Sequence, residues 1–297
     1  MIKVANGFCD LCIPYNEKKE VMLEIFKELI DAGYRNVAVE QTYSHESLNS
    51  KNGNDLIPEP VKLDEFKEQL KNKLNLFNRL TIEYSDPSVS HACGRSLNFK
   101  KYHLIAALPT TETALQHSCQ MFLGDIITYN EETVKIRLSR KFYYLAIRRN
   151  MFFELKYSPA IIDSSERRAT ISRAQQYHMI GKSRGIILTS EAKDPFHIRN
   201  PYDVGCLGYI FGLSEEQGRS AVSTLGRKVL LAAESRRLGK TPVLVKYEDV
   251  NSSSDEEEGG SDEEDEIGAE EQSSEDNLGK RKDNSCTDKN NKRIKIS

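Results

Sequence analysis

Short apolar runs, rich in β-branched and aromatic residues, alternate with longer stretches of helical periodicity along the chain. The runs are NVAVEQ (36–41), RLTIEY (79–84), YHLIAAL (102–108), GDIITY (124–129), FYYLAI (142–147), FFELKY (152–157) and GIILTS (185–190), with MIKVA or GFCDL supplying another at the start. A strand that is apolar on both faces is buried on both faces, which is typical of a parallel sheet covered by helices. The alternation therefore predicts an α/β fold.

The number of these strand–helix units favours a closed barrel over an open sheet. Seven or eight units in about 250 residues are typical of a β/α barrel of the TIM type. No glycine-rich dinucleotide-binding loop follows the first run, which weakens the case for an open Rossmann sheet. Ser214 and Gln217 have the spacing of a helix capping box. We expect one TIM-barrel-like (β/α) domain over residues 1–250.

The end of the chain differs in composition from the rest. Residues 251–276 hold 13 Asp or Glu and no Lys or Arg, and residues 277–297 hold 7 Lys or Arg and 2 Asp. A segment without aromatic residues cannot offset the entropy cost of ordering, so we expect a disordered tail over 251–297. Two basic clusters separated by a spacer predict a bipartite nuclear import signal. Its residues are Lys280, Arg281, Lys282, Lys292, Arg293 and Lys295.

The acidic tail hides a mildly basic domain. Removing its 7 basic and 15 acidic residues from the 42 and 45 of the whole chain leaves a net charge of +5 in the first 250 residues. No apolar run approaches the roughly 20 residues that a membrane-spanning helix needs. The apolar run at the start is interrupted by polar residues and proline, so we also expect no signal peptide.

Sequence patterns typical of catalytic sites occur in the wrong context. GKSRG (181–185) has the spacing of a nucleophile elbow, but a helix precedes it and a strand follows, the reverse of what that turn requires. Cys9 and Cys12 lack the second pair of ligands that a zinc site needs. The six histidines form no H-x-H or H-E-x-x-H pattern. We expect no catalytic residue, metal site or cofactor. The alternative is a metal-dependent barrel phosphoesterase whose metal ligands come from the ends of several strands.

Two adjacent arginines, Arg167 and Arg168, lie where a helix is expected to begin. Asp163 is the expected N-cap, with Glu166 at the third helical position. The helix dipole disfavours cations at this end, so the arginines indicate an anion, and a forked guanidinium suits phosphate or carboxylate. Neighbouring residues point about 100° apart on a helix. We expect Arg168 to face an external anion and Arg167 to serve the packed side; the alternative is pairing with Asp163 or Glu166.

The stretch RLSRKFYYLAIRR (137–149) interleaves basic and aromatic residues. It lacks the glycines of the RNA-recognition-motif consensus. We expect a strand with basic ends, and those ends could contact phosphate.

Four sequence blocks resemble one known family. They are DLCIP (10–14), RLTIEYSDPS (79–88), FELKYSPAIIDSSERRATIS (153–172) and IRNPYDVGCLGYIFGLSEEQGRSAVS (198–223). In matching order they are similar to blocks of the 30-kilodalton protein subunit of nuclear ribonuclease P, which is shared with ribonuclease MRP and has archaeal counterparts. Arg148 and Asn150 depart from the family pattern, and Asn150 suits a left-handed turn.

The resemblance implies a TIM-barrel-like, non-catalytic subunit of a ribonucleoprotein whose RNA, with a divalent metal such as Mg²⁺, performs catalysis. The implied reaction removes the 5′ leader from precursor tRNA, with precursor rRNA as the substrate of ribonuclease MRP. The implied partners are the ribonuclease P and ribonuclease MRP RNAs and a Pop5-type small α/β subunit, in the nucleus and nucleolus, with no membrane. The candidate RNA contacts are then Arg167, Arg168, Arg173, Lys182, Arg184 and Arg199.

Overall fold

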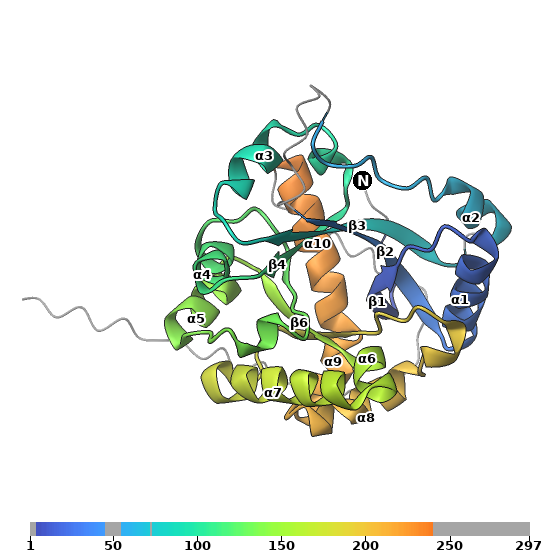
Figure 1. Ribbon diagram of the computed structural model, residues 1–297. Helices are drawn as coiled ribbons and strands as arrows, with labels where there is room; N and C mark the ends of the chain where they lie inside the picture. The colour runs from blue at the N-terminus through green and yellow to red at the C-terminus, as the bar shows by residue number, and fades with distance from the viewer. Residues whose placement is uncertain (1–3, 45–54, 72, 240–297) are drawn as a thin grey trace, which may run out of the picture. The chain divides into compact units, whose positions relative to one another are not determined.

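The computed structural model describes residues 4–44, 55–71 and 73–239 of the chain. Seven strands form one sheet in chain order, and every neighbouring pair is parallel. They are β1 (Phe8–Pro14), β2 (Tyr34–Ser44), β3 (Asn75–Tyr84), β4 (Leu104–Pro109), β5 (Ile126–Ile127), β6 (Phe152–Lys156) and β7 (Ile186–Thr189). The sheet curls into a nearly closed barrel surrounded by helices, which confirms the predicted TIM-barrel-like fold (Figure 1). The predicted tail and its import clusters lie outside the described residues.

Helices connect the strands and cover their outer faces. They are α1 (Lys19–Asp31), α2 (Asp64–Gln69), α3 (Val89–Arg95), α4 (Glu112–Gln120), α5 (Arg140–Arg148), α6 (Tyr157–Ile162), α7 (Ser164–Gly181), α8 (Pro201–Ile210), α9 (Glu215–Ala221) and α10 (Thr224–Leu238), with 3-10 turns η2 (Phe99–Lys101), η3 (Thr133–Lys135) and η4 (Pro195–His197). In Figure 1, α1 and α2 lie on one side of the barrel, and α4 and α5 on the opposite side. Among the described residues, none of the helices combines the length and apolarity needed to span a membrane.

The predicted strand FYYLAI (142–147) is wrong, because these residues belong to helix α5. Ser139 caps the helix by accepting a hydrogen bond from the Phe142 backbone at 3.4 Å. Only one side of the helix is fully buried, through Tyr143 and Ala146, which are three residues apart as helical packing requires. The helix ends before Asn150, whose φ of 56° is the left-handed turn expected for it. Parallel strands β5 and β6 need a crossover, and α5 provides it.

The barrel closes between β1 and β7 without a regular ladder between these two strands. The Glu191 backbone N–H donates to the Cys12 carbonyl at 2.9 Å, just beyond the end of β7. The Asp10 carboxylate accepts the backbone N–H groups of Ser190 at 3.1 Å and Cys12 at 3.3 Å. One buried carboxylate therefore supplies hydrogen bonds that a strand pair would otherwise provide. Burial raises the pKa of Asp10 to about 6, although these N–H donors oppose the shift.

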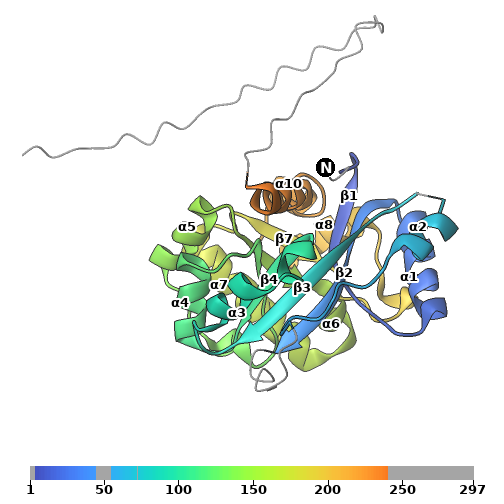
Figure 2. The ribbon, with the colours of Figure 1, turned by 90° about the horizontal axis from the view of Figure 1, so that it is seen from above.

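Helix α10 covers the amino-terminal end of the barrel (Figure 2). Its apolar residues Val229, Leu230 and Ala233 join one buried cluster with residues from all seven strands. A side chain at Gly226 would lie 2.6 Å from the Cβ of Cys9, so glycine is required for this close approach. The Arg236 guanidinium donates two hydrogen bonds of 2.9 Å to the Asp125 carboxylate. These contacts fix α10 as the floor of the barrel.

The segment around α8 and α9 packs against the outer face of the barrel. Ser214 and Gln217 form the predicted capping box at the start of α9. Phe211 is only 4% exposed and belongs to the largest apolar core, whereas Ile210 is 61% exposed. Phe211 therefore seats this segment on the barrel, whereas Ile210, the last residue of α8, faces the solvent.

We predict that Phe211→Ala lowers the free energy of unfolding by about 3–5 kcal/mol, since it opens a cavity in the largest core. The matched control is Ile210→Ala, one residue earlier, which should change stability by no more than about 0.5 kcal/mol. Urea unfolding followed by circular dichroism measures both. Equal losses in the two variants would contradict the burial of Phe211.

Candidate functional site

The barrel interior changes from apolar to charged along its axis. Near the amino-terminal end, Ala38, Phe77, Phe152 and Ile187 pack together above α10. Successive side chains on a strand alternate between its faces, so residues two positions further along point into the same interior. These positions are Glu40 on β2, Arg79 on β3, Glu154 on β6 and Thr189 on β7, all buried. A charged layer therefore lies above an apolar one.

Arg79 is the centre of this charged layer, and its side chain has no exposure to solvent. Its guanidinium forms a bidentate salt bridge with the Glu154 carboxylate, with N–O distances of 2.5 and 2.7 Å. It also contacts Glu40 at 3.2 Å and donates to the Leu11 carbonyl at 2.8 Å. Thr81 accepts a hydrogen bond from the Arg79 Nε at 3.2 Å and donates to Glu40. A single side chain of β3 thus connects β1, β2 and β6 through the interior.

The Arg79 charge controls the ionisation of both carboxylates. Burial alone would raise the pKa of Glu154, but Arg79 outweighs it and holds that pKa at about 2. The pKa of Glu40 is likewise lowered by Arg79 against the effect of burial. Both groups are therefore charged at neutral pH and cannot act as proton donors there.

Lys156 supplies a second buried cation at the carboxyl end of the barrel. Its ammonium lies 2.7 Å from the Glu191 carboxylate. Burial would lower the pKa of Lys156, but Glu191, Cys12 and Glu40 raise it above its ordinary value. Glu191 has a left-handed backbone, with a φ of 56°, at the first turn after β7. Glu191 therefore pairs with Lys156 from a backbone conformation that is uncommon for a residue other than glycine.

One group in the part of the chain that the structure describes has the spacing of a metal site. The Cys12 thiol and the carboxylates of Glu40 and Glu191 lie within 4.8 Å of one another. Burial raises the pKa of the Cys12 thiol well above its ordinary value, so the thiolate that binds metals is disfavoured. Lys156 and Arg79 already pair with the two carboxylates. A metal ion would have to compete with two internal cations for these oxygens.

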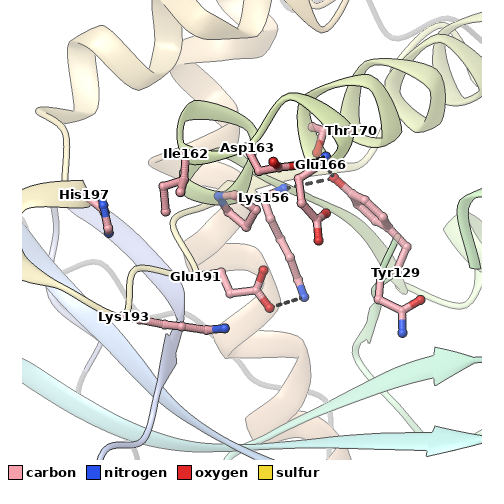
Figure 3. A pocket seen from close by; sticks show the side chains of 11 residues that line it. Tyr129, Lys156, Ile162, Asp163, Glu166, Thr170, Glu191, Lys193 and His197 are labelled. Carbon is pink, nitrogen blue, oxygen red and sulfur yellow. Dashed lines mark hydrogen bonds and ion pairs between the residues drawn. The ribbon is translucent and has the colours of Figure 1, made fainter. Parts of the chain in front are cut away.

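A cavity of about 330 Å³ opens beside Lys156 at the carboxyl end of the barrel (Figure 3). Tyr129, Lys156 and Glu191 line it on the barrel side, and Asp163 and Glu166 at the start of α7. The remaining lining residues are Asn130, Pro159, Ile162, Thr170, Lys193 and His197. The dashed lines in Figure 3 mark the Lys156–Glu191 ion pair and the hydrogen bond from Tyr129 to Thr170. The cavity wall carries both signs of charge.

The two arginines at the start of α7 lie at the rim of this end of the barrel. Asp163 is the N-cap, as predicted, and accepts the backbone N–H groups of Ser165 and Glu166. Arg167 donates to the carbonyls of Ala160 at 2.7 Å and Ile161 at 3.1 Å, at the end of α6. Carbonyls, not the carboxylates proposed as an alternative, thus hold Arg167. The exposed Arg168 makes one long hydrogen bond, 3.3 Å, to the Ser164 carbonyl.

The structure contradicts one predicted RNA contact, Arg173, which is 3% exposed. Its guanidinium donates to the carbonyls of Thr133 and Ile136 and lies over the rings of Tyr129 and Tyr177. An arginine that is enclosed in this way holds η3 against α7 and does not face a polyanion. The sequence could not show this, because Arg173 lies on a helix whose buried side is unusually polar.

The other candidates do not form one surface. Lys182 and Arg184 are exposed at the far end of α7, which leads into β7. Arg199 lies between β7 and α8, in a strand-to-helix loop. Its half-buried guanidinium donates to the carbonyls of Phe196 and Ile198. Arg168 and Lys182 are 14 positions apart along and just beyond α7, which separates them by roughly 20 Å at 1.5 Å per residue.

The charged layer itself was not predicted from the sequence. Its signal is a pair of charged residues at alternate positions within an apolar strand, as in Glu154 and Lys156 of FFELKY. Such a pair points to one face of the strand. In a barrel that face is the interior, so the pattern indicates buried charges that need partners.

Comparison with known proteins identifies relatives. The family model described as RNase P subunit p30 matches residues 7–238. The ribonuclease P protein subunit p30 of Mus musculus is 38% identical over 166 residues, which are 55% of this chain and 62% of the mouse protein. A probable ribonuclease P protein subunit 3 of Schizosaccharomyces pombe is 28% identical over 73% of this chain and 88% of its own length.

Among solved structures, a chain from an archaeal ribonuclease P with mature tRNA is similar, with a TM-score of 0.55 at 16% identity. The match covers 84% of this chain and all of the archaeal chain. At this identity the likeness supports the barrel fold.

We predict that Arg79→Met lowers the free energy of unfolding by about 3–5 kcal/mol at pH 7, because it leaves two buried carboxylates without their cation. In the wild type, the pKa of Glu154 is about 2, below its ordinary 4.5, so its stabilising charge is lost only as the pH falls toward 2. In the variant, burial raises the carboxylate pKa values, so acidification from pH 7 to pH 5 should reduce the difference from the wild type. Urea unfolding at both pH values measures this effect.

The control for this prediction is the double variant Arg79→Met with Glu154→Gln, which removes one stranded charge and should recover part of the stability. A deficit in Arg79→Met that stays constant from pH 7 to pH 5 would contradict the ionic explanation.

Proposed function

The chain belongs to the RNase P subunit p30 family, and from this membership we propose that it is a non-catalytic, RNA-binding subunit of ribonuclease P. In this role it supports RNA-catalysed removal of the 5′ leader from precursor tRNA. We extend the proposal to ribonuclease MRP, acting on precursor rRNA, because a relative of this chain from Saccharomyces cerevisiae is named a ribonuclease P/MRP protein subunit. The site of action is the nucleus and nucleolus.

The observation that carries the non-catalytic role is the occupation of the barrel interior by the protein's own cations. In barrel enzymes the carboxyl ends of the strands hold the catalytic groups. Here Arg79 pairs with Glu40 and Glu154, and Lys156 pairs with Glu191. These carboxylates are neutralised inside the fold, and neither a nucleophile–base pair nor a free carboxylate pair is assembled from them. This arrangement also argues against the metal-dependent phosphoesterase, since its ligands would have to displace both cations.

The proposed RNA contacts are those exposed candidate cations whose guanidinium or ammonium groups are not held by two backbone carbonyls; Arg167 is exposed as well, but it is held in this way. Arg168 is exposed with one weak internal hydrogen bond, and Lys182 and Arg184 are exposed at the other end of α7. Arg167 and Arg199 donate to backbone carbonyls, so their proposed role is to shape the rim from which Arg168 projects. The catalytic metal, Mg²⁺ in this proposal, is bound by the RNA and not by this chain.

The proposed partners are the ribonuclease P and ribonuclease MRP RNAs and other protein subunits, including a Pop5-type small α/β protein. The archaeal chain that shares this fold was solved in ribonuclease P with mature tRNA. This setting supports a place for the barrel within a large ribonucleoprotein, where precursor tRNA is contacted through the assembly.

We predict that the purified full-length protein does not cleave precursor tRNA in Mg²⁺, Mn²⁺ or Zn²⁺ buffers. Immunopurification of the tagged protein from cells should instead recover a ribonucleoprotein that releases the 5′ leader and loses activity after nuclease treatment of its RNA. Sequencing of the recovered RNA identifies the catalytic component. Cleavage by the RNA-free protein would refute the proposed non-catalytic role.

We also predict that the basic clusters of the tail direct the protein to the nucleus. Replacing Lys280, Arg281, Lys282, Lys292, Arg293 and Lys295 with Ala should shift a fluorescently tagged protein to the cytoplasm. Recovery of the ribonucleoprotein RNA from lysates should remain intact, because the changed residues lie outside residues 7–238, which the family model matches. A heterologous import signal fused to the variant should restore nuclear location. An unchanged distribution of the variant would argue against the import role.

A further inference from the structure

Helix α5 and the segment before it contain five exposed cations. They are Lys135, Arg137, Arg140, Lys141 and Arg148. No Asp or Glu occurs between Glu132 and Glu154, although six basic residues do. The sixth, Arg149, is bound to the carbonyls of Ser118, Cys119 and Phe122. The positive charge of this stretch is therefore not balanced by acidic residues within the same segment.

These five cations also lack carboxylate partners from elsewhere among the described residues. Surface cations in other parts of the domain have such partners, for example Lys19 with Glu65 and Lys101 with Glu59. The nearest acids in sequence, Glu131 and Glu132, precede η3, and Glu112 begins the neighbouring helix α4. None of the three forms an ion pair with this surface within the described chain.

The helix places its cations together because of its period. Arg140, Lys141 and Arg148 fall within about 100° around the helix axis and extend over about 12 Å along it. Tyr143 and Ala146 occupy the opposite side and are buried. Tyr144 lies on the basic side, with the Arg140 guanidinium 5.6 Å from its ring centre. Had this segment been a strand, the alternation of side chains would have divided the same cations between two faces.

The loop after α7 packs against α5 through the buried Tyr143 and adds one more exposed arginine near this helix. The Tyr143 hydroxyl donates to the Arg184 carbonyl at 2.5 Å, which fixes the loop after α7 beside α5. The Arg184 side chain is exposed there. We call the exposed side chains of Arg137, Arg140, Lys141, Arg148 and Arg184 the α5 surface; Lys135, which lies in η3, is not counted in it.

We propose that the α5 surface binds the phosphate backbone of RNA. This inference rests on the proposed function and adds a contact region separate from Arg168 at the rim. Four of its five cations are arginines, whose forked donors match phosphate oxygens, and no internal carboxylate has to be displaced. Contacts of this kind position an RNA without selecting its sequence.

The test uses the full-length protein and, as probe, the RNA that co-purifies with the wild type, transcribed and labelled. The test variant carries Arg140→Gln, Lys141→Gln and Arg148→Gln. The matched control carries Lys18→Gln, Lys27→Gln and Lys62→Gln, which removes the same charge from exposed positions around α1 and α2, on the opposite side of the barrel (Figure 1). Affinities are measured from 50 to 400 mM salt, and thermal melts verify that both variants fold.

Loss of three phosphate contacts should flatten the log–log salt slope by about 2–3 and weaken binding by on the order of a hundredfold at 0.1 M salt. The control should keep the wild-type slope. Equal slopes for the test variant and wild type, or equal changes in the test and control variants, would overturn the inference. So would loss of a protein subunit from the purified particle with an unchanged RNA slope, since the α5 surface would then bind protein.

Failure of this inference can be distinguished from failure of the proposed function. If wild-type protein does not bind the RNA, the proposed function fails. If wild type binds and the α5 variant matches it, only the α5 surface is excluded. Arg168→Ala serves as an independent arm, because it tests the rim and should change the slope by about 0.7–0.9 for a single contact.

Discussion

The buried pair of Arg79 and Glu154 is the interaction on which the barrel interior depends. The two residues are 75 positions apart in sequence and come from β3 and β6, yet both are fully excluded from water. Removing such charges from water costs several kcal/mol each, and only a close, hydrogen-bonded partner offsets that cost. The strands are therefore constrained to a register in which guanidinium and carboxylate meet. The same guanidinium reaches Glu40 and the Leu11 carbonyl, so four strands share the constraint.

Because these buried charges pair with one another, the barrel interior offers few free groups to a ligand. A barrel enzyme keeps unpaired polar groups at the carboxyl ends of its strands, ready for a substrate. In this barrel the corresponding groups neutralise one another, and Lys156 and Glu191 extend the pairing to the mouth. Binding chemistry is consequently left to side chains on the outer helices, where cations such as Arg168 and Arg148 have no carboxylate partner among the described residues. The paired charges inside and these unpaired cations outside are consistent with the proposed RNA-binding role.

The barrel could be predicted from the sequence because its strands are buried on both faces. Strands β2 to β7 each coincide with one of the apolar runs, and β1 begins within the run GFCDL. The prediction fails at α5, where FYYLAI is as apolar as a strand but is buried on one side only. The charged layer is hidden for a different reason. Arg79 and Glu154 become partners only through strand register, and register is a property of the whole sheet that no local pattern reports. Arg173 is misplaced for a third reason: the buried side of α7 contains Thr170, Arg173 and Tyr177, so apolarity does not identify it.

The length of α7 separates the two proposed RNA contact regions. Arg168 lies at its start, near the mouth of the barrel, and Arg184 lies beyond its end, beside α5. At 1.5 Å per residue these sites are more than 20 Å apart along the helix, well beyond a Debye length of about 8 Å at physiological salt. One phosphate cannot satisfy both, and the two sites do not reinforce each other electrostatically. A barrel that uses both must contact RNA at two separated points, and two such points leave a rigid body free to rotate only about the line between them, whereas one contact leaves every rotation free.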